Sequence, residues 1–309
     1  MSHTGSIGDK LFKAALLAAS AVIPLLVGSI IYMMVDNSMP TIRRFGLGFL
    51  YGSEWRPSDE MFGALPFIYG TLVSSLIAVL LAVPVSIGVA IFLVEQAPVK
   101  VGRPIAFMVD LLAAIPSVVY GLWGIFVLAP FIREYLGPAL QNTLGFIPIF
   151  QGRITGLGML TAGIILALMI TPIITAVVRD VLEAVPVTQR EAALALGATK
   201  WETTSIVLGN AASGIAGAVV LGLGRAIGET MAVTMVIGNS PQISASIFEP
   251  ANTIASLLAA NFAEATDRLY LSALIEIGLV LFLVTFVVNA LAKLLIMKVA
   301  SGPDRAKAT

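Results

Sequence analysis

The sequence is poor in charge, contains no cysteine and has a single histidine. Charged side chains make up 12% of its 309 residues, whereas 58% of the residues are hydrophobic, and acids and bases cancel to a net charge of zero. A soluble domain carries about 25% charged residues, so this composition indicates an integral membrane protein. The absence of cysteine excludes disulfides and thiolate metal sites.

Further absences narrow the functional classes. The one histidine, His3, lies in the polar N-terminal tail, which excludes a histidine metal cluster and a Ser-His-Asp triad. No Gly-x4-Gly-Lys-[Ser/Thr] motif occurs, so the chain has no P-loop to hold ATP. Basic residues form no block, and nucleic acid is not expected as a partner. We expect no catalytic residue, metal or cofactor in this chain.

Six apolar segments are long enough to cross a bilayer, which takes about 20 helical residues. They predict an all-α membrane protein with six transmembrane helices, at residues 14–35, 65–94, 105–132, 154–178, 214–238 and 269–296. A short helix is expected at 254–262. We divide the chain into residues 1–64 (tail, first helix and external loop), a core of five helices at 65–300, and a cytoplasmic tail at 301–309.

The distribution of lysine and arginine predicts how the segments face, because positive charge collects on the cytoplasmic side. With the N-terminus inside, eleven of the 18 basic residues fall in cytoplasmic segments and six fall on the opposite side. The remaining one, Arg225, lies within the fifth apolar segment. We therefore expect both termini in the cytoplasm.

Arg225 and Glu229 are the only ionisable residues of the fifth apolar segment, and their i,i+4 spacing puts them on one helix face. A charge at membrane depth costs about 2.5–3.5 kcal/mol, so such a pair is usually functional. A pair that only fixes helix packing is the alternative. Gly224 and Gly228 repeat at the same spacing, which favours close approach of a neighbouring helix. We expect a charged, water-lined path here.

The cytoplasmic stretch 188–209 predicts a helix, a glycine turn and a second helix. It contains two possible capping boxes, Thr188 with Glu191 and Thr199 with Glu202. Gly197 stands where the first helix should end, because glycine adopts the left-handed conformation without a clash. Such an elbow suits docking into a groove of a partner, although a purely structural cap at Glu191 explains the spacing equally well.

The pattern Glu191-Ala-Ala-x-x-x-Gly197 resembles the EAA loop by which permease subunits of bacterial ATP-binding-cassette importers contact their ATPases. Further stretches look like the phosphate-specific transport permeases, and resemble their C-type subunit more than its A-type partner. They are Leu65-Pro-Phe-Ile-Tyr-Gly-Thr71-Leu, Leu111-Leu-Ala-Ala-Ile-Pro116-Ser-Val-Val-Tyr120-Gly-Leu-Trp123-Gly and Gly222-Leu-Gly-Arg225-Ala-Ile-Gly-Glu229-Thr-Met231-Ala-Val. The similarity covers roughly residues 60–296. The family usually ends the loop motif with Ile-x-Leu-Pro, where this chain has Val207-Leu-Gly-Asn210; Gly-Asn can still end a helix.

The resemblance implies the type I ABC importer permease fold, with six transmembrane helices and a cytoplasmic coupling helix, in the bacterial inner membrane. It implies a non-ATPase subunit in a lipid bilayer that transports inorganic phosphate. Its implied partners are an A-type permease subunit, two copies of a cytoplasmic ATP-binding subunit and a periplasmic phosphate-binding protein. The family's intramembrane arginine and glutamate match Arg225 and Glu229, and its ATPase contact matches Glu191, Ala192 and Gly197.

The residues themselves agree with an anion path, because the planar fork of arginine can engage phosphate through two hydrogen bonds. Secondary candidates to line the cavity are Glu276, Thr71 and Ser74, although membrane hydroxyls more often serve helix packing. Three alternatives stay open: a permease for another oxyanion such as molybdate or sulfate, an ion-driven secondary transporter, and a scaffold that relays phosphate status. The secondary transporter leaves the elbow without a role.

Overall fold

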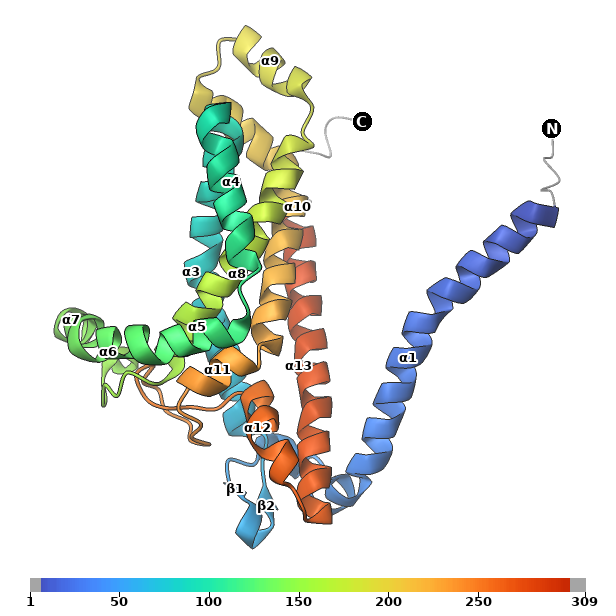
Figure 1. Cartoon of the computed structure of the whole chain (residues 1–309), viewed down its shortest axis with the longest axis vertical. Coiled ribbons are helices and arrows are strands. Elements are labelled where there is room, and N and C mark those ends of the chain that lie inside the picture. The colour runs from blue at the N-terminus through green and yellow to red at the C-terminus, as the bar shows by residue number, and fades with distance from the viewer. Residues whose placement is uncertain (1–6, 301–309) are drawn as a thin grey trace.

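The computed structural model describes residues 7–300, which are almost entirely helical (Figure 1). The expected tail at 301–309 lies outside the described residues. The long helices are α1 (Ile7–Phe45), α3 (Leu65–Ile91), α4 (Val99–Ala113), α8 (Met159–Glu183), α10 (Lys200–Gly228) and α13 (Arg268–Ala300). The short ones are α2 (Gly48–Tyr51), α5 (Ser117–Trp123), α6 (Ala129–Phe131), α7 (Gly137–Leu144), α9 (Val187–Ala195), α11 (Met231–Val236) and α12 (Ile254–Asn261). Strands β1 (Trp55–Arg56) and β2 (Met61–Phe62) form an antiparallel hairpin.

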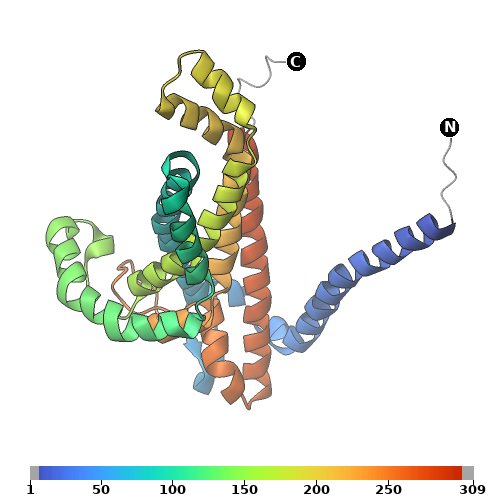
Figure 2. The same cartoon turned by 45° about the horizontal axis from the view of Figure 1, so that its top comes forward.

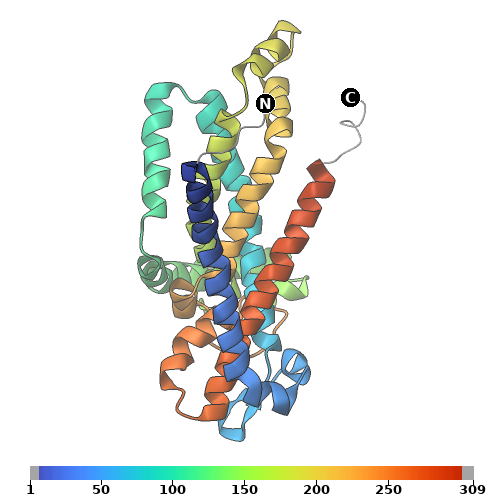
Figure 3. The same ribbon diagram turned by 90° about the vertical axis from the view of Figure 1, so that its right-hand side faces the viewer.

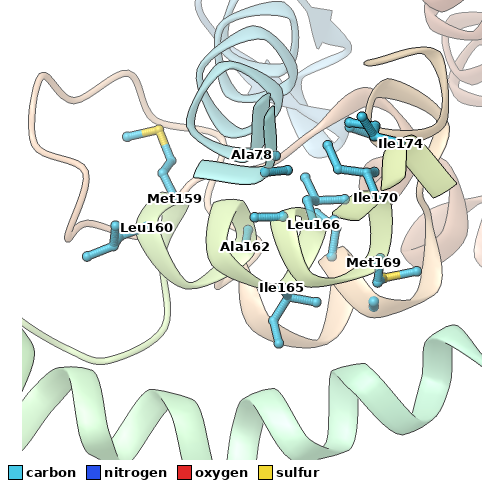
Figure 4. Packing of buried hydrophobic residues seen from close by; sticks show 14 of the residues in the cluster. Ala78, Met159, Leu160, Ala162, Ile165, Leu166, Met169, Ile170 and Ile174 are labelled. Atoms are coloured by element: carbon cyan, nitrogen blue, oxygen red, sulfur yellow. The ribbon is translucent and has the colours of Figure 1, made fainter. Parts of the chain in front are cut away.

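Helix α8 is the centre of the bundle and packs against α3 and α10. In its most apolar window 67% of the residues are buried, compared with 22% in α3 and in α10. Figure 4 shows Ala78 of α3 against the buried side chains of α8. A Cβ added to Gly163 would meet Ile77 of α3 at 2.5 Å, and one on Gly222 of α10 would meet Ile174 at 2.7 Å. These close approaches make α8 the rigid support for the helices on either side.

Six helical stretches within residues 7–300 are long and apolar enough to cross a membrane, as the sequence predicts, but their bounds differ from expectation. The segment 105–132 is not one helix. α4 ends at Ala113, and α5 begins after Pro116, whose ψ of 140° is extended. Proline also disfavours helical backbone at the residue before it, which favours a helix end at Ile115. The third spanning candidate is therefore Ser117–Leu144.

The two pieces of this segment run in different directions. α4 lies beside α8, whereas α5, α6 and α7 form an arm across the direction of the long helices (Figures 1 and 2). α5 packs on α11 so closely that a Cβ on Gly121 would meet the sulfur of Met235 at 2.5 Å. The loop before α8 is also extended, and α8 starts at Met159 rather than at residue 154. The expected short helix at 254–262 is present as α12.

Helix α1 diverges from the bundle and meets α13 near the C-terminal end of α1 (Figures 1 and 3). No residue of its most apolar window is buried. At the contact, Thr41 Oγ1 hydrogen-bonds Ser272 Oγ at 2.7 Å. The β1–β2 hairpin lies at this end of the molecule, where Trp55 packs edge-on against Phe62 and Phe67. Helix α9 lies at the opposite end, so the long helices separate the hairpin from the elbow.

Candidate translocation and coupling sites

The helix that carries Arg225 breaks one turn further on, at Glu229. α10 ends at Gly228, Glu229 is extended with a ψ of 127°, and α11 begins at Met231. The expectation of one helix over 214–238 is therefore wrong, and α10 instead starts at Lys200. Oε1 of Glu229 accepts the Ala232 N–H at 3.5 Å, at the start of α11. A carboxylate placed there satisfies a donor that the broken helical ladder leaves free.

Arg225 and Glu229 face each other across this helix end, but only loosely. Nη2 of Arg225 lies 3.9 Å from Oε2 of Glu229, beyond hydrogen-bond distance. The Arg225 side chain is 46% exposed and that of Glu229 is 8% exposed. Because the acid is buried and the guanidinium is half-open, the donors of the arginine are accessible to an anion in the adjoining space.

The pair lines a groove of about 450 Å³ that also touches Asn289 of α13. A Cβ on Gly228 would meet nothing within 4 Å, and one on Gly224 would come no closer than 3.9 Å to Asn289 Nδ2. Within this chain the two glycines therefore do not mediate close helix approach, contrary to expectation. They leave open space beside the arginine, and Gly222, on another face of α10, makes the close contact with α8.

Asn289 is a groove residue that the sequence reasoning missed. Its Oδ1 is buried and has no hydrogen-bond partner among the described residues. A lone amide in an apolar helix was the available signal, because polar groups in membrane helices are usually paired or functional. Its Nδ2 group lies on the same groove as the guanidinium of Arg225. An anion in the groove would thus meet a charged donor from α10 and a neutral donor from α13.

The other predicted cavity residues lie elsewhere. Glu276 is buried, with one carboxylate oxygen lacking a partner, but it precedes Asn289 by 13 residues on α13, about 20 Å along the helix. Thr71 and Ser74 are each 1% exposed. Thr71 Oγ1 donates to Phe67 O and accepts the Ile254 N–H at 3.0 Å, and Ser74 donates to Gly70 O. Both hydroxyls are thus engaged in packing α3, which argues against a role in lining a path.

The elbow forms at the expected place with one of its two capping boxes. Thr199 and Glu202 make the reciprocal hydrogen bonds of a box at the start of α10. The box of Thr188 with Glu191 is not formed, because Pro186 caps α9 and Thr188 already lies inside the helix. Gly197 has a φ of +86° and donates to Leu194 O at 2.9 Å. With Ala198 N–H bonded to Ala193 O, this is a Schellman ending that turns the chain sharply.

The second arm of the elbow is the first part of α10, which runs on without a stop at Gly209-Asn210. The expected helix end at these residues is therefore wrong. Asn210 instead links α10 to α9, since its Nδ2 donates a hydrogen bond to Gln189 Oε1 of α9 at 2.8 Å. Gly209 has open space around its Cα and no left-handed conformation, so glycine-asparagine here does not end the helix.

Arg190 holds the elbow onto the bundle, and the sequence reasoning did not single it out. Its Nη2 lies 2.8 Å from Glu95 Oε1, in the turn that follows α3. Its guanidinium also donates to the carbonyls of Leu182 at 2.9 Å and Val185 at 2.7 Å, at the end of α8. One side chain thus ties α9 to two core helices, while Glu191, Ala192 and Gly197 remain exposed beside it.

Comparison of folds places the chain with known importer permeases. A structure described as an inward-facing conformation of the MetNI methionine ABC transporter, in its CY5 native crystal form, aligns over 80% of this chain and 99% of the matched chain. The TM-score is 0.59 at 17% identity, a level that supports the shared fold alone. The six-helix arrangement with the α9 elbow thus has the fold of the importer permeases.

Sequence comparison gives closer relatives. The phosphate transport system permease protein PstC of Mesorhizobium japonicum is 44% identical over 95% of this chain and 91% of its own length. The PstC protein of Xylella fastidiosa is 45% identical over 94% and 91%. The family model of the binding-protein-dependent transport system inner membrane component matches residues 82–301. This chain is therefore a multi-pass membrane protein that belongs to the inner membrane component family of binding-protein-dependent transport systems.

Proposed function

We propose that the chain is a transmembrane permease subunit of an ATP-driven phosphate importer. The observation that carries this proposal is the half-exposed guanidinium of Arg225 on an open groove at a helix break. The PstC relatives, whose names state phosphate transport, point to the same solute. The chain holds no P-loop motif, which leaves ATP hydrolysis to another subunit. The resemblance to the phosphate permeases implies two copies of a cytoplasmic ATPase in that role.

In this mechanism, phosphate competes with Glu229 for Arg225. The two side chains are 3.9 Å apart without a hydrogen bond, so little interaction is lost when Arg225 turns towards a solute. Arginine offers phosphate two parallel donors, and Asn289 adds a neutral one from the facing helix. When phosphate leaves, Glu229 again neutralises the guanidinium, which avoids an isolated charge at membrane depth.

The elbow transmits the movement of the ATPases to this path. Leu194, Leu196 and Trp201 are exposed large apolar side chains around Glu191, a composition that suits docking into a groove of a partner subunit. α9 is continuous, through Gly197, with α10, whose far end carries Arg225. A push on the elbow therefore acts on the helix that bears the phosphate site.

We infer that both termini lie in the cytoplasm with the elbow. α1 begins and α13 ends on the side of α9, and the lysine and arginine distribution favours that side as the inside (Figure 1). The hairpin end then faces the periplasm, where a phosphate-binding protein delivers its ligand. The translocation path is completed by a second, A-type permease subunit against the open side of the Arg225 groove.

The test is uptake of labelled phosphate by the complex reconstituted in vesicles, with the binding protein outside and ATP on the side of the ATPases. Arg225→Gln is expected to abolish uptake while the complex assembles normally. Arg133→Gln is the matched control, because Arg133 is exposed and pairs only with its neighbour Glu134. Full uptake by the Arg225 variant would overturn the mechanism.

The same vesicles separate the alternatives. Competition by molybdate or sulfate that exceeds competition by unlabelled phosphate would indicate another oxyanion as the solute. Uptake without ATP would indicate an ion-driven secondary transporter. A scaffold that only relays phosphate status would show no uptake in any variant.

A further inference from the structure

Two adjoining cavities lie between α1 and α13, apart from the groove at Arg225. The first, of about 560 Å³, is at the hairpin end and is lined by three charged side chains, Asp36, Arg43 and Arg268. The second, of about 400 Å³, is lined almost entirely by apolar side chains, Met33 and Phe262 among them. Neither cavity has a role in the transport mechanism described above.

The charges of the first cavity are not neutralised by the protein. Within residues 7–300, Arg43 and Arg268 make no ion pair or hydrogen bond that would occupy their guanidinium groups, and the carboxylate of Asp36 has no basic partner. The neighbouring Arg44 differs, since it pairs with Glu60 and stacks over the Phe45 ring. Two arginines without a partner among the described residues match a ligand that carries a phosphate group.

The second cavity begins where the first ends. Asn37 and Ile275 line both cavities, so the two spaces are continuous. The polar one uses α1 residues 36–43, whereas the apolar one uses residues 30–37, which lie further from the hairpin end along the helix. Its wall contains Ile30 and Met33, which are 49% and 62% exposed. A charged head and an apolar tail placed in this order follow the direction of a lipid in a bilayer.

The floor of the groove is rigid. Ser272 of α13 accepts the Thr41 hydroxyl at 2.7 Å and lies at the polar cavity. One or two turns deeper, Gly278 lets α1 approach so closely that an added Cβ would meet the terminal methyl of Met34 at 2.8 Å. The hydrogen bond and this close approach join α1 to α13 along the floor of the groove.

We propose that this groove binds one glycerophospholipid, with its phosphate between Arg43 and Arg268 and one acyl chain along Met33 and Phe262. In the orientation proposed above it is a lipid of the periplasmic leaflet. Free phosphate would leave the apolar cavity unfilled, and an apolar helix of a partner subunit would leave two arginines buried with only one carboxylate, Asp36, beside them.

The test is native mass spectrometry of the complete transporter, stripped of lipid in detergent and then mixed with phosphatidylethanolamine, phosphatidylglycerol or diacylglycerol. The double variant R43Q/R268Q is expected to bind both phospholipids with roughly tenfold or more lower affinity, and the unmodified complex should bind both more tightly than diacylglycerol. R44Q, at the same end of α1 but paired with Glu60, should bind like the unmodified complex.

The apolar half is tested separately by filling it. Met33→Trp is expected to weaken lipid binding, whereas Tyr32→Trp, at an exposed neighbour that lines neither cavity, should not. Equal lipid retention in R43Q/R268Q, equal binding of diacylglycerol, or displacement by inorganic phosphate would each overturn the proposal. So would a cross-link from residue 33 to the second permease that excludes lipid. Lipid occupancy is measured without transport, so the lipid proposal and the proposed phosphate import can be disproved independently of each other.

Discussion

Nη2 of Arg190 lies 2.8 Å from Oε1 of Glu95, and the two side chains are only 18% and 11% exposed. The pair joins the elbow to the end of α3, while the same guanidinium holds two carbonyls at the end of α8. An elbow fastened in this way moves with the core of the bundle, so movement of the ATPases reaches both α10 and its support.

Removal of one member of this pair should uncouple ATP hydrolysis from transport. Glu95→Gln leaves the arginine without its counter-charge, and breaking a buried pair costs up to about 3–5 kcal/mol. We expect the number of phosphate ions moved per ATP to fall several-fold while the complex still assembles. Glu134→Gln, which breaks an exposed pair with Arg133, should change neither quantity. An unchanged transport ratio in Glu95→Gln would show that the clamp has no coupling role.

Replacing glycine by alanine at two positions of the elbow should change the stability of the protein in opposite directions. Gly197 has a φ of +86°, where a Cβ costs about 1–2 kcal/mol. Gly209 lies inside α10 with open space around it, where alanine gains about 0.5–1 kcal/mol. The midpoint temperature of thermal unfolding in detergent should therefore fall for Gly197→Ala and rise for Gly209→Ala. Asparagine at 197 should recover part of the loss, because it tolerates the left-handed conformation better than alanine.

Substitutions at two glycines of α10 should distinguish an effect on helix packing from an effect on the phosphate path. A Cβ on Gly222 would meet Ile174 at 2.7 Å, so Gly222→Ala should lower the thermal stability of the complex. Gly228 faces open space, and Gly228→Val should leave assembly unchanged but narrow the groove beside Arg225. We expect phosphate uptake by the Gly228 variant to drop at least several-fold. Normal uptake by a stable Gly228→Val complex would place the path elsewhere.

Asn289→Leu should stabilise the protein but impair phosphate transport. The buried Oδ1 lacks a partner, and removing such an unsatisfied group is worth about 1–3 kcal/mol. The unfolding midpoint should therefore rise, while loss of the Nδ2 donor from the groove raises the KM for phosphate delivered by the binding protein. Asn289→Gln keeps an amide and should transport better than the leucine variant. A fall in stability for Asn289→Leu would mean that the amide has a structural partner in the assembled complex.

Much of the local structure of this protein could be predicted without coordinates. The length of the apolar segments alone predicts six membrane helices. The Gly197 turn and the Thr199 cap follow from residues within four positions of each other. Such features depend on backbone hydrogen bonds and steric limits that neighbours in sequence already contain. Arg225 and Glu229 belong to this class, since one helical turn separates them.

Contacts between distant segments were decided by the tertiary structure alone. The helix break at Glu229, the arrival of Asn289 at the Arg225 groove and the Arg190–Glu95 clamp depend on how α8 positions α3 and α10, and on where α13 packs. So does the groove in which Arg43 meets Arg268, 225 residues apart by the numbering of the printed sequence. In lipid, an apolar helix face gains nothing by facing protein instead of lipid tails, so hydrophobicity does not determine which helices pack together. The close fit of side chains selects one arrangement.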